Sequence, residues 1–129
     1  MKLLICGGRK WNDKELIESA IKQCKPTLII EGGASGADNL AAKIAKEQNI
    51  EFKEFLPDWM SYGKAAGMIR NKQMLDEGKP DLVMAFHSDL SKSKGTKNMI
   101  EQATKAGIKV IHVKGKDNDN TVKENAGKE

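Results

Sequence analysis

Apolar residues gather in short runs separated by stretches with helical spacing, which predicts alternating strands and helices. Lys2–Cys6, Thr27–Ile30 and Asp81–Phe86 are apolar runs of the length that buried strands have. Glu51–Phe55 alternates polar and apolar residues, which is typical of a strand near a sheet edge. Lys109–Val113 is the last predicted strand. The pattern therefore predicts five strands.

Helical spacing fills most of the gaps between these strands. Apolar positions 16, 17, 20, 21 and 24 lie on one helix face, after Asn12-Asp13 as N-cap and before Pro26 as terminator. Further helices are predicted over about 37–45, over about 65–76, and around Met99, Ile100 and Ala103. Residues 56–64 are predicted to form a long irregular connection.

Five strands that alternate with four helices predict one α/β domain with a doubly wound parallel sheet and helices on both faces. The economical strand order is 3-2-1-4-5, which opens a crevice between strands 1 and 4 at their carboxyl ends. We expect this domain to span residues 1–113. Residues 114–129 have no apolar cluster and are predicted to be a flexible polar tail.

Composition narrows the class of protein. The chain has 129 residues, of which 39% are hydrophobic and 31% are charged, and a net charge of +4. No apolar stretch is long enough to cross a membrane, so we expect a cytoplasmic protein without membrane contact. Cys6 and Cys24 are too few and too isolated for a disulfide framework or a zinc site. We predict no metal and no cofactor. Lysines alternate with acids, so nucleic-acid binding is permitted but not favoured.

Two glycine-rich turns follow predicted strands and precede predicted helices. They are Gly32–Asp38 and Ser93–Thr96. Backbone amides at a helix start bind phosphate, and glycine lets an anion approach closely. Neither turn matches the Walker or the dinucleotide-binding pattern, which disfavours an ATPase or a dehydrogenase. Each turn alone could be a tight turn only, but two at one sheet edge predict a phosphorylated ligand.

Other side chains add to this candidate site. Arg70 is one of two arginines and can bind phosphate through two hydrogen bonds, or else form a surface ion pair. Trp11 could stack on a base or pack in the core. The predicted ligand-binding residues are Gly7, Gly8, Arg9, Trp11, Gly32, Gly33, Ala34, Ser35, Gly36, Asp38, Arg70, Asn71, Lys94, Gly95 and Thr96.

These motifs together resemble the YspA-type, cpYpsA-related branch of the SLOG superfamily. The resemblance is carried by Gly7-Gly8-Arg9 with Trp11 and Asp13, Glu31–Ala34 with Gly36-Ala37-Asp38, Asp58-Trp59, Gly67, Arg70-Asn71 with Met74, Pro80-Asp81, and Gly95-Thr96 with Met99. It implies a Rossmann-like domain that binds a nucleotide-derived ligand, often as a homo-oligomer. Of the two glycine turns, Gly32–Asp38 keeps the family pattern and is favoured as the phosphate cradle. Relatives include LOG-type phosphoribohydrolases and the DNA-processing protein DprA.

The resemblance leaves three functions to compare. LOG enzymes carry a glutamate where this chain has Met99, and Arg70 is followed by Asn71 instead of lysine. This favours binding, by a protein that senses or sequesters an ADP-ribose-like or cyclic-nucleotide signal. The first alternative is a nucleotide hydrolase in which Arg70 acts with Glu31 or Asp38, or in which Asp58 supplies the carboxylate. The second is DprA-like binding of single-stranded nucleic acid.

Overall fold

The computed structural model describes residues 1–115 and contains one sheet of five parallel strands. The order is β3-β2-β1-β4-β5, which confirms the predicted topology. In the register of the central strands, Leu4 of β1 pairs with Ile30 of β2 and with Val83 of β4. The strands are β1 (Lys2–Gly7), β2 (Leu28–Glu31), β3 (Glu51–Glu54), β4 (Leu82–Phe86) and β5 (Lys109–Val113).

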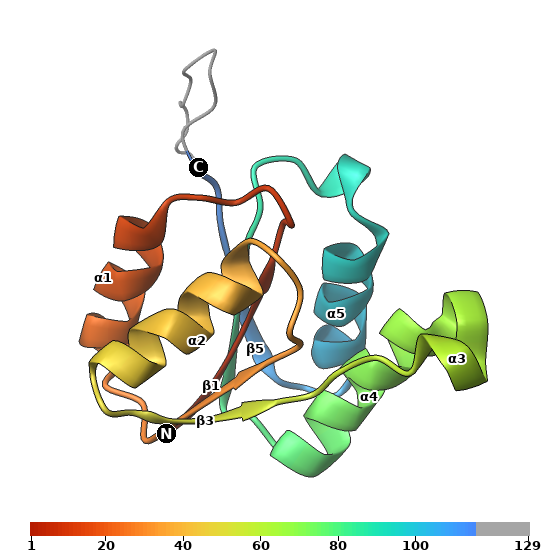
Figure 1. The fold of residues 1–129 in the computed structure, drawn as a ribbon, viewed down its shortest axis with the longest axis horizontal. Helices are drawn as coiled ribbons and strands as arrows, with labels where there is room; N and C mark the ends of the chain where they lie inside the picture. Colours follow the sequence, from red (N-terminus) through yellow and green to blue (C-terminus); the bar gives the residue numbers. More distant parts are fainter. Residues whose placement is uncertain (116–129) are drawn as a thin grey trace.

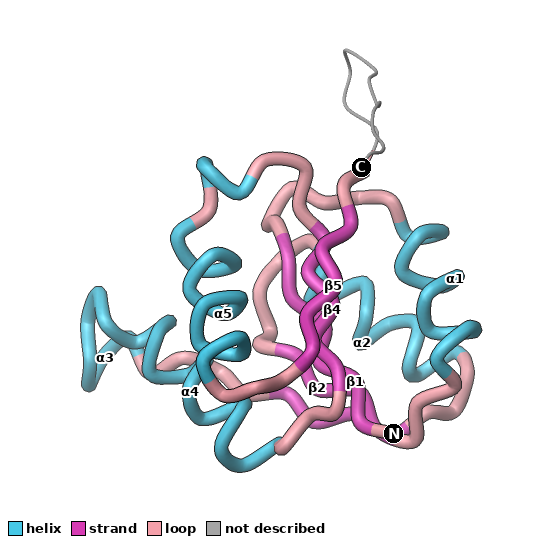
Figure 2. Tube along the Cα trace, turned by 180° about the vertical axis from the view of Figure 1, so that it is seen from behind, coloured by secondary structure: helices cyan, strands magenta, loops and turns pink. Residues whose placement is uncertain are grey.

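Helices cover both faces of the sheet, as predicted. Figure 2 shows α1 and α2 on one side of the strands and α4 and α5 on the other. The short α3 lies beyond α4, away from the sheet (Figure 1). The helices are α1 (Lys14–Cys24), α2 (Ala37–Glu47), α3 (Trp59–Tyr62), α4 (Ala66–Gly78) and α5 (Lys94–Lys105).

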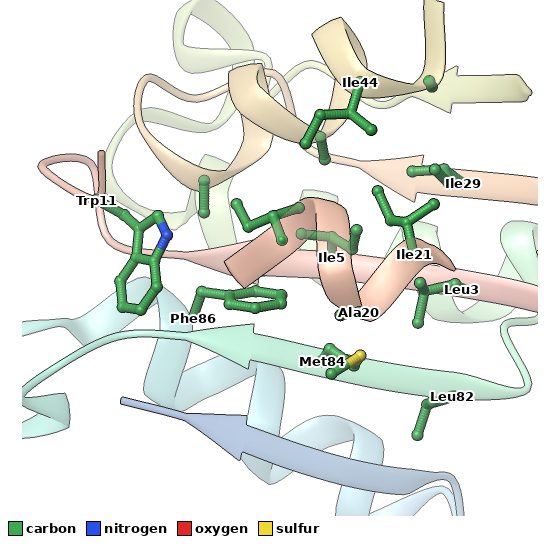
Figure 3. Packing of buried hydrophobic residues seen from close by; sticks show 14 residues of the cluster. Leu3, Ile5, Trp11, Ala20, Ile21, Ile29, Ile44, Leu82, Met84 and Phe86 are labelled. Carbon is green, nitrogen blue, oxygen red and sulfur yellow. The ribbon is translucent and has the colours of Figure 1, made fainter. Parts of the chain in front are cut away.

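The central strands bury side chains on both faces because each face carries two helices. Leu3 and Ile5 of β1 pack toward α1 and α2, in the cluster drawn in Figure 3. Leu4 and Cys6 alternate with them and pack toward α4 and α5. This explains why β1 and β4 are continuous apolar runs, whereas β3 at the edge is mostly exposed.

Local signals set several boundaries. Asp13 caps α1 by accepting a hydrogen bond from the Leu16 amide at 3.2 Å, as its position in the sequence predicts. Segment 56–64, predicted to be irregular, instead contains α3. Asp58 caps this single turn through the Ser61 amide at 3.1 Å, and a 3₁₀ turn follows at Gly63–Ala65. One turn is too short to produce a helical apolar period, so the pattern missed it.

The predicted domain and tail are described only in part. Residues 1–113 form the sheet and its helices, and the described chain continues through Gly115. The remainder of the predicted tail, 116–129, lies outside the described residues. No helix in the described part of the chain combines the length and the apolar character that crossing a membrane requires.

Candidate functional site

A large cleft opens at the carboxyl ends of β1 and β4, where the topology predicts a crevice. Its volume is about 910 Å³, within the range of small-molecule sites. Figure 1 shows the loop after β1, the start of α2 and the start of α5 at this same end of the sheet. We call it the main cleft. Its walls are residues 6–13, Ala34, Asp38, Arg70, Asn71, Met74, His87, Ser88, 92–96, Met99 and Gly115.

The start of α5 forms one wall of the main cleft. Ser93 caps this helix, its hydroxyl oxygen accepting a hydrogen bond from the Thr96 amide at 3.1 Å. The amides of Lys94 and Gly95 lie in the first turn, where a helix offers no internal acceptor. Gly95 and Lys94 are exposed, while Thr96 is buried. This turn therefore presents backbone donors and a positive helix end to the cleft.

The Gly32–Asp38 turn uses its amides differently. Asp38 accepts hydrogen bonds from the Gly32 and Ala34 amides, both at 3.2 Å, and Glu31 accepts one from the Gly33 amide at 2.6 Å. The sequence favoured this turn as the phosphate cradle. In the structure three of its amides donate to carboxylates of the chain itself, so the α5 turn offers the freer donors.

Gly36 serves the fold. It has a φ of 80°, and a Cβ at this position would lie 2.1 Å from the Gly8 carbonyl oxygen. The Ala37 amide donates to that same oxygen at 3.2 Å. Gly36 does not line the main cleft. Its role in the described chain is to bring the β2 turn against the β1 loop.

The two acids beneath this turn hold their protons unusually tightly. Burial raises the pKa of Asp38 to about 6, against the opposing effects of the Ala34 and Gly32 amides and of Arg70. Burial and a hydrogen bond with Glu54 raise the pKa of the Glu31 carboxyl to about 8. Glu31 is fully buried, and its Oε2 accepts no hydrogen bond from the described residues. A carboxyl with this raised pKa is protonated at neutral pH, and a protonated Glu31 needs no donor to its Oε2 because the acid itself donates to Glu54.

Arg70 joins the glycine turn to α4. Its Nη1 donates to the Gly32 carbonyl oxygen and to the Phe55 carbonyl oxygen, the latter at 3.3 Å. Its Nε donates to Asn71 Oδ1 at 3.1 Å. Burial lowers the pKa of Arg70, and the nearby charges of Asp38 and Glu31 oppose that shift. The guanidinium lines the main cleft, as a residue predicted to bind phosphate should.

Asn71 positions neighbouring groups more than it faces a ligand. Its Nδ2 donates to the Gly95 carbonyl oxygen and to Asn98 Oδ1, both at 3.1 Å, and its Oδ1 accepts from Arg70. Only 3% of its surface is exposed. Asn71 therefore links Arg70 on α4 to the first turn of α5. Asn71 also lines the main cleft, and its predicted role in ligand binding stays a prediction.

Trp11 packs in the core. Its ring meets Phe86 edge to face at 5.6 Å, and its indole N–H donates to the Asp13 carbonyl oxygen at 3.0 Å (Figure 3). It is 9% exposed, at the edge of the main cleft. The structure shows the packing role, and the predicted role of Trp11 in stacking on a base stays a prediction. Arg9, in contrast, is exposed beside the main cleft.

A second, smaller hollow adjoins the main cleft. Its volume is about 380 Å³, and we call it the side cleft. Sequence reasoning did not assign Leu56, Pro57 or Trp59 to a site, although Asp58-Trp59 belongs to the motifs of the resemblance. The walls are Arg9, Gly32, Gly33, Ala34, Ser35, Leu56, Pro57, Trp59 and Arg70.

His87 also faces the main cleft, at the end of β4. Its Nδ1 accepts a hydrogen bond from the Asp89 amide at 3.0 Å, and burial lowers its pKa. Both effects favour the neutral ring. Within residues 1–115, no three or more His, Cys, Asp or Glu side chains are grouped so as to hold a metal ion.

Comparisons with known proteins agree with this fold and these motifs. Residues 1–62 match the family described as YAcAr, the YspA, cpYpsA-related SLOG family. The Gene 61 protein of Mycobacterium phage D29 is 34% identical over 121 residues, which cover 86% of this chain and 94% of the phage protein. The chain belongs to the YspA, cpYpsA-related SLOG family.

A solved structure extends the likeness to the fold. The X-ray structure of DNA processing protein A (DprA) from Streptococcus pneumoniae matches 92% of this chain with a TM-score of 0.73. The matched region is 52% of that DprA chain, so this chain spans about half its length. Sequence identity is 18%, and the likeness therefore concerns the Rossmann-type fold.

Proposed function

We propose that this protein binds a nucleotide or a nucleotide-derived phosphorylated ligand in the main cleft, and that it senses or sequesters a signal such as an ADP-ribose-like molecule or a cyclic nucleotide. The observation that carries the proposal is Gly95 in the open first turn of α5. Membership of the SLOG family supports a nucleotide-related ligand.

Gly95 is not needed for the fold of α5. A Cβ at this position would meet nothing within 4 Å, and its φ lies outside the left-handed region. Glycine in a helix costs about 0.5–1 kcal/mol relative to alanine. A glycine that packing does not require, at a helix start that lines a cleft, is well suited to close approach by a phosphate.

Positive side chains surround this position. Lys92 and Lys94 line the main cleft at the start of α5, and Arg9 of the loop after β1 and Arg70 of α4 line it as well. An anion at the first turn of α5 would therefore be attracted by several positive side chains. An arginine such as the exposed Arg9 can bind a phosphate through two parallel hydrogen bonds, whereas Nε and Nη1 of Arg70 already donate within the chain and leave its Nη2 to contact an anion.

The carboxylates near the main cleft favour binding over cleavage. Met99 is fully buried at the position where LOG-type enzymes carry a glutamate. Asp38 lines the cleft, but its Oδ2 already accepts from two amides, and Glu31 lines neither cleft. A hydrolase would need a carboxylate that is free to stabilise the oxocarbenium-like transition state. Release of free base from nucleoside monophosphates, detected by chromatography, would support hydrolysis instead.

The predicted homo-oligomer stays a prediction, with one surface that supports it. Met60, Tyr62, Met68 and Ile69 are exposed apolar side chains on α3 and α4, and Met60 is 98% exposed. Apolar side chains gathered on a surface commonly mark a protein interface. The mass of the full chain in solution, measured by light scattering, tests this prediction.

The binding proposal is tested by calorimetric titration of the full chain with AMP, ADP-ribose, NAD and cyclic AMP. At least one should bind, and Lys94→Ala should weaken that binding about threefold to tenfold, because it removes a charge at the first turn of α5. Lys97→Ala is the matched control, since Lys97 is exposed on the same helix but lines neither cleft. Failure of all four ligands to bind would refute the proposal, as would equal affinities for the two variants.

A further inference from the structure

The side cleft lies directly against the main cleft. Arg9, Ala34 and Arg70 line both hollows. The boundary between them is therefore made of two cationic side chains and one small residue. A ligand that extends from the main cleft past these three residues enters the side cleft without meeting a large apolar side chain.

Part of the lining of the side cleft is apolar. Leu56 is 65% exposed and Trp59 is 50% exposed, and Pro57 lies between them in the sequence. Leu56 lies against the turn, because a Cβ on Gly33 would come within 2.4 Å of its Cδ2. The ring of Trp59 lies near Gly67 of α4, 3.7 Å from where a Cβ would be. These glycines leave room for the two side chains to cover the backbone.

The rest of the lining of the side cleft is polar. It consists of the Gly32–Ser35 backbone, the exposed Ser35 side chain and the guanidinium groups of Arg9 and Arg70. Ser35 Oγ donates to the Arg9 carbonyl oxygen at 3.4 Å, which ties this wall to the β1 loop. A nucleobase has apolar faces and polar edges, so it matches a cleft that is lined both by an indole and by polar groups.

From this arrangement we propose that the side cleft is a second nucleoside subsite, with Trp59 as the stacking platform, and that the ligand is a dinucleotide. Its first nucleoside lies in the main cleft, its diphosphate bridge runs from the first turn of α5 toward Arg9 and Arg70, and its second base stacks on Trp59. This proposal rests on the proposed function and names the class of ligand that the combined site takes.

Two acids next to residues that line the side cleft disfavour a ligand longer than two units. Glu54 lies beside Gly33, as a Cβ there would be 3.3 Å from Glu54 Cγ. Asp58, next to Trp59 in the sequence, is exposed and its pKa is lowered by hydrogen bonds from Ser61. A longer strand would bring its next phosphate toward these acids, and like charges repel. A short dinucleotide avoids them.

The test compares AMP, diadenosine diphosphate and a twelve-nucleotide oligo(dA) by calorimetry with the wild-type chain, Trp59→Ala and Met60→Ala. Met60 is the matched control, because it follows Trp59 on α3, is almost fully exposed and lines neither cleft. Diadenosine diphosphate should bind wild type at least tenfold more tightly than AMP. Trp59→Ala should remove that advantage and leave the AMP affinity unchanged, while Met60→Ala should change neither.

The outcomes separate this inference from the proposed function. If AMP binds but diadenosine diphosphate binds no more tightly, or if Trp59→Ala retains the difference, the second subsite is refuted and the main-cleft function stands. If neither nucleotide binds, both fail. If oligo(dA) binds more tightly than diadenosine diphosphate, the side cleft belongs to a strand-binding surface and the dinucleotide is refuted.

Discussion

The two glycine turns look alike in sequence but occupy different physical situations. In the Gly32–Asp38 turn, the amides donate to Asp38 and Glu31, and a Cβ on Gly36 would collide with the Gly8 carbonyl oxygen. In the α5 turn, Gly95 touches nothing that a Cβ would disturb, and it faces the main cleft. A glycine that packing demands says little about a ligand, whereas one that packing does not demand is evidence of approach from outside.

The difference also concerns charge. The Gly32–Asp38 turn encloses buried acids, so its backbone amides donate hydrogen bonds to carboxyl groups of the chain itself. The glycine turn at the start of α5 has lysines at positions 92 and 94, and the first helical turn of α5 contains no acid. An external anion would therefore compete with Asp38 for the amides of the Gly32–Asp38 turn. It would meet no such competitor at the start of α5.

The largest effect should come from Gly36→Ala. A side chain at φ 80° combines backbone strain with a 2.1 Å approach to the Gly8 carbonyl oxygen. Strain and overpacking each cost about 1–3 kcal/mol, so the free energy of unfolding should fall by about 3 kcal/mol or more. Urea unfolding followed by circular dichroism measures it. A free energy of unfolding close to that of wild type would show that close packing does not require glycine at position 36 in the Gly32–Asp38 turn.

A smaller, pH-dependent effect is expected from Glu31→Gln. The folded-state pKa of Glu31, about 8, lies above its ordinary 4.5, so the folded protein binds more protons between these pH values. The stabilisation is present in full below about pH 4.5 and is lost as the pH rises through 8, with a slope of up to about 1.4 kcal/mol per pH unit. Asp38 adds a similar loss only between 3.8 and about 6.

Glutamine at position 31 mimics the protonated acid. It can accept from the Gly33 amide and donate to Glu54, and it does not ionise. Between pH 6 and 8 the free energy of unfolding should therefore be nearly independent of pH in Glu31→Gln, whereas in wild type it should decline as the pH rises. Glu101→Gln, an exposed change on α5, should retain the wild-type decline. Parallel curves for wild type and Glu31→Gln would contradict the buried, protonated state of Glu31.

The smallest effect on stability is expected from Gly95→Ala. Because the added Cβ meets nothing within 4 Å, the free energy of unfolding should stay level or rise by up to about 1 kcal/mol. Binding of the nucleotide identified by calorimetry should weaken about tenfold, since the methyl group enters the cleft. A variant that is destabilised yet binds normally would reverse the contrast between the two turns.

The sequence by itself determined most of the fold. Apolar runs defined β1, β2 and β4, because strands buried on both faces admit few polar residues, and polar–apolar alternation indicated β3 near the sheet edge. Helical spacing located the four long helices. The right-handed βαβ rule then supplied the strand order. The motifs around Gly7, Gly32, Arg70 and Gly95 indicated the family and the sheet edge where the main cleft lies.

Only the tertiary structure decided what each residue does there. Whether an amide is free depends on which side chain packs beneath it, and the contact of Asp38 with Gly32 and Ala34 is not encoded in glycine spacing. Asn71 bridges two helices through Gly95, and Trp11 lies against Phe86, contacts between segments far apart in the chain. Trp59 comes to adjoin the main cleft for the same reason. Local pattern sets the elements, but side-chain packing between elements assigns their donors, acids and rings to the fold or to the site.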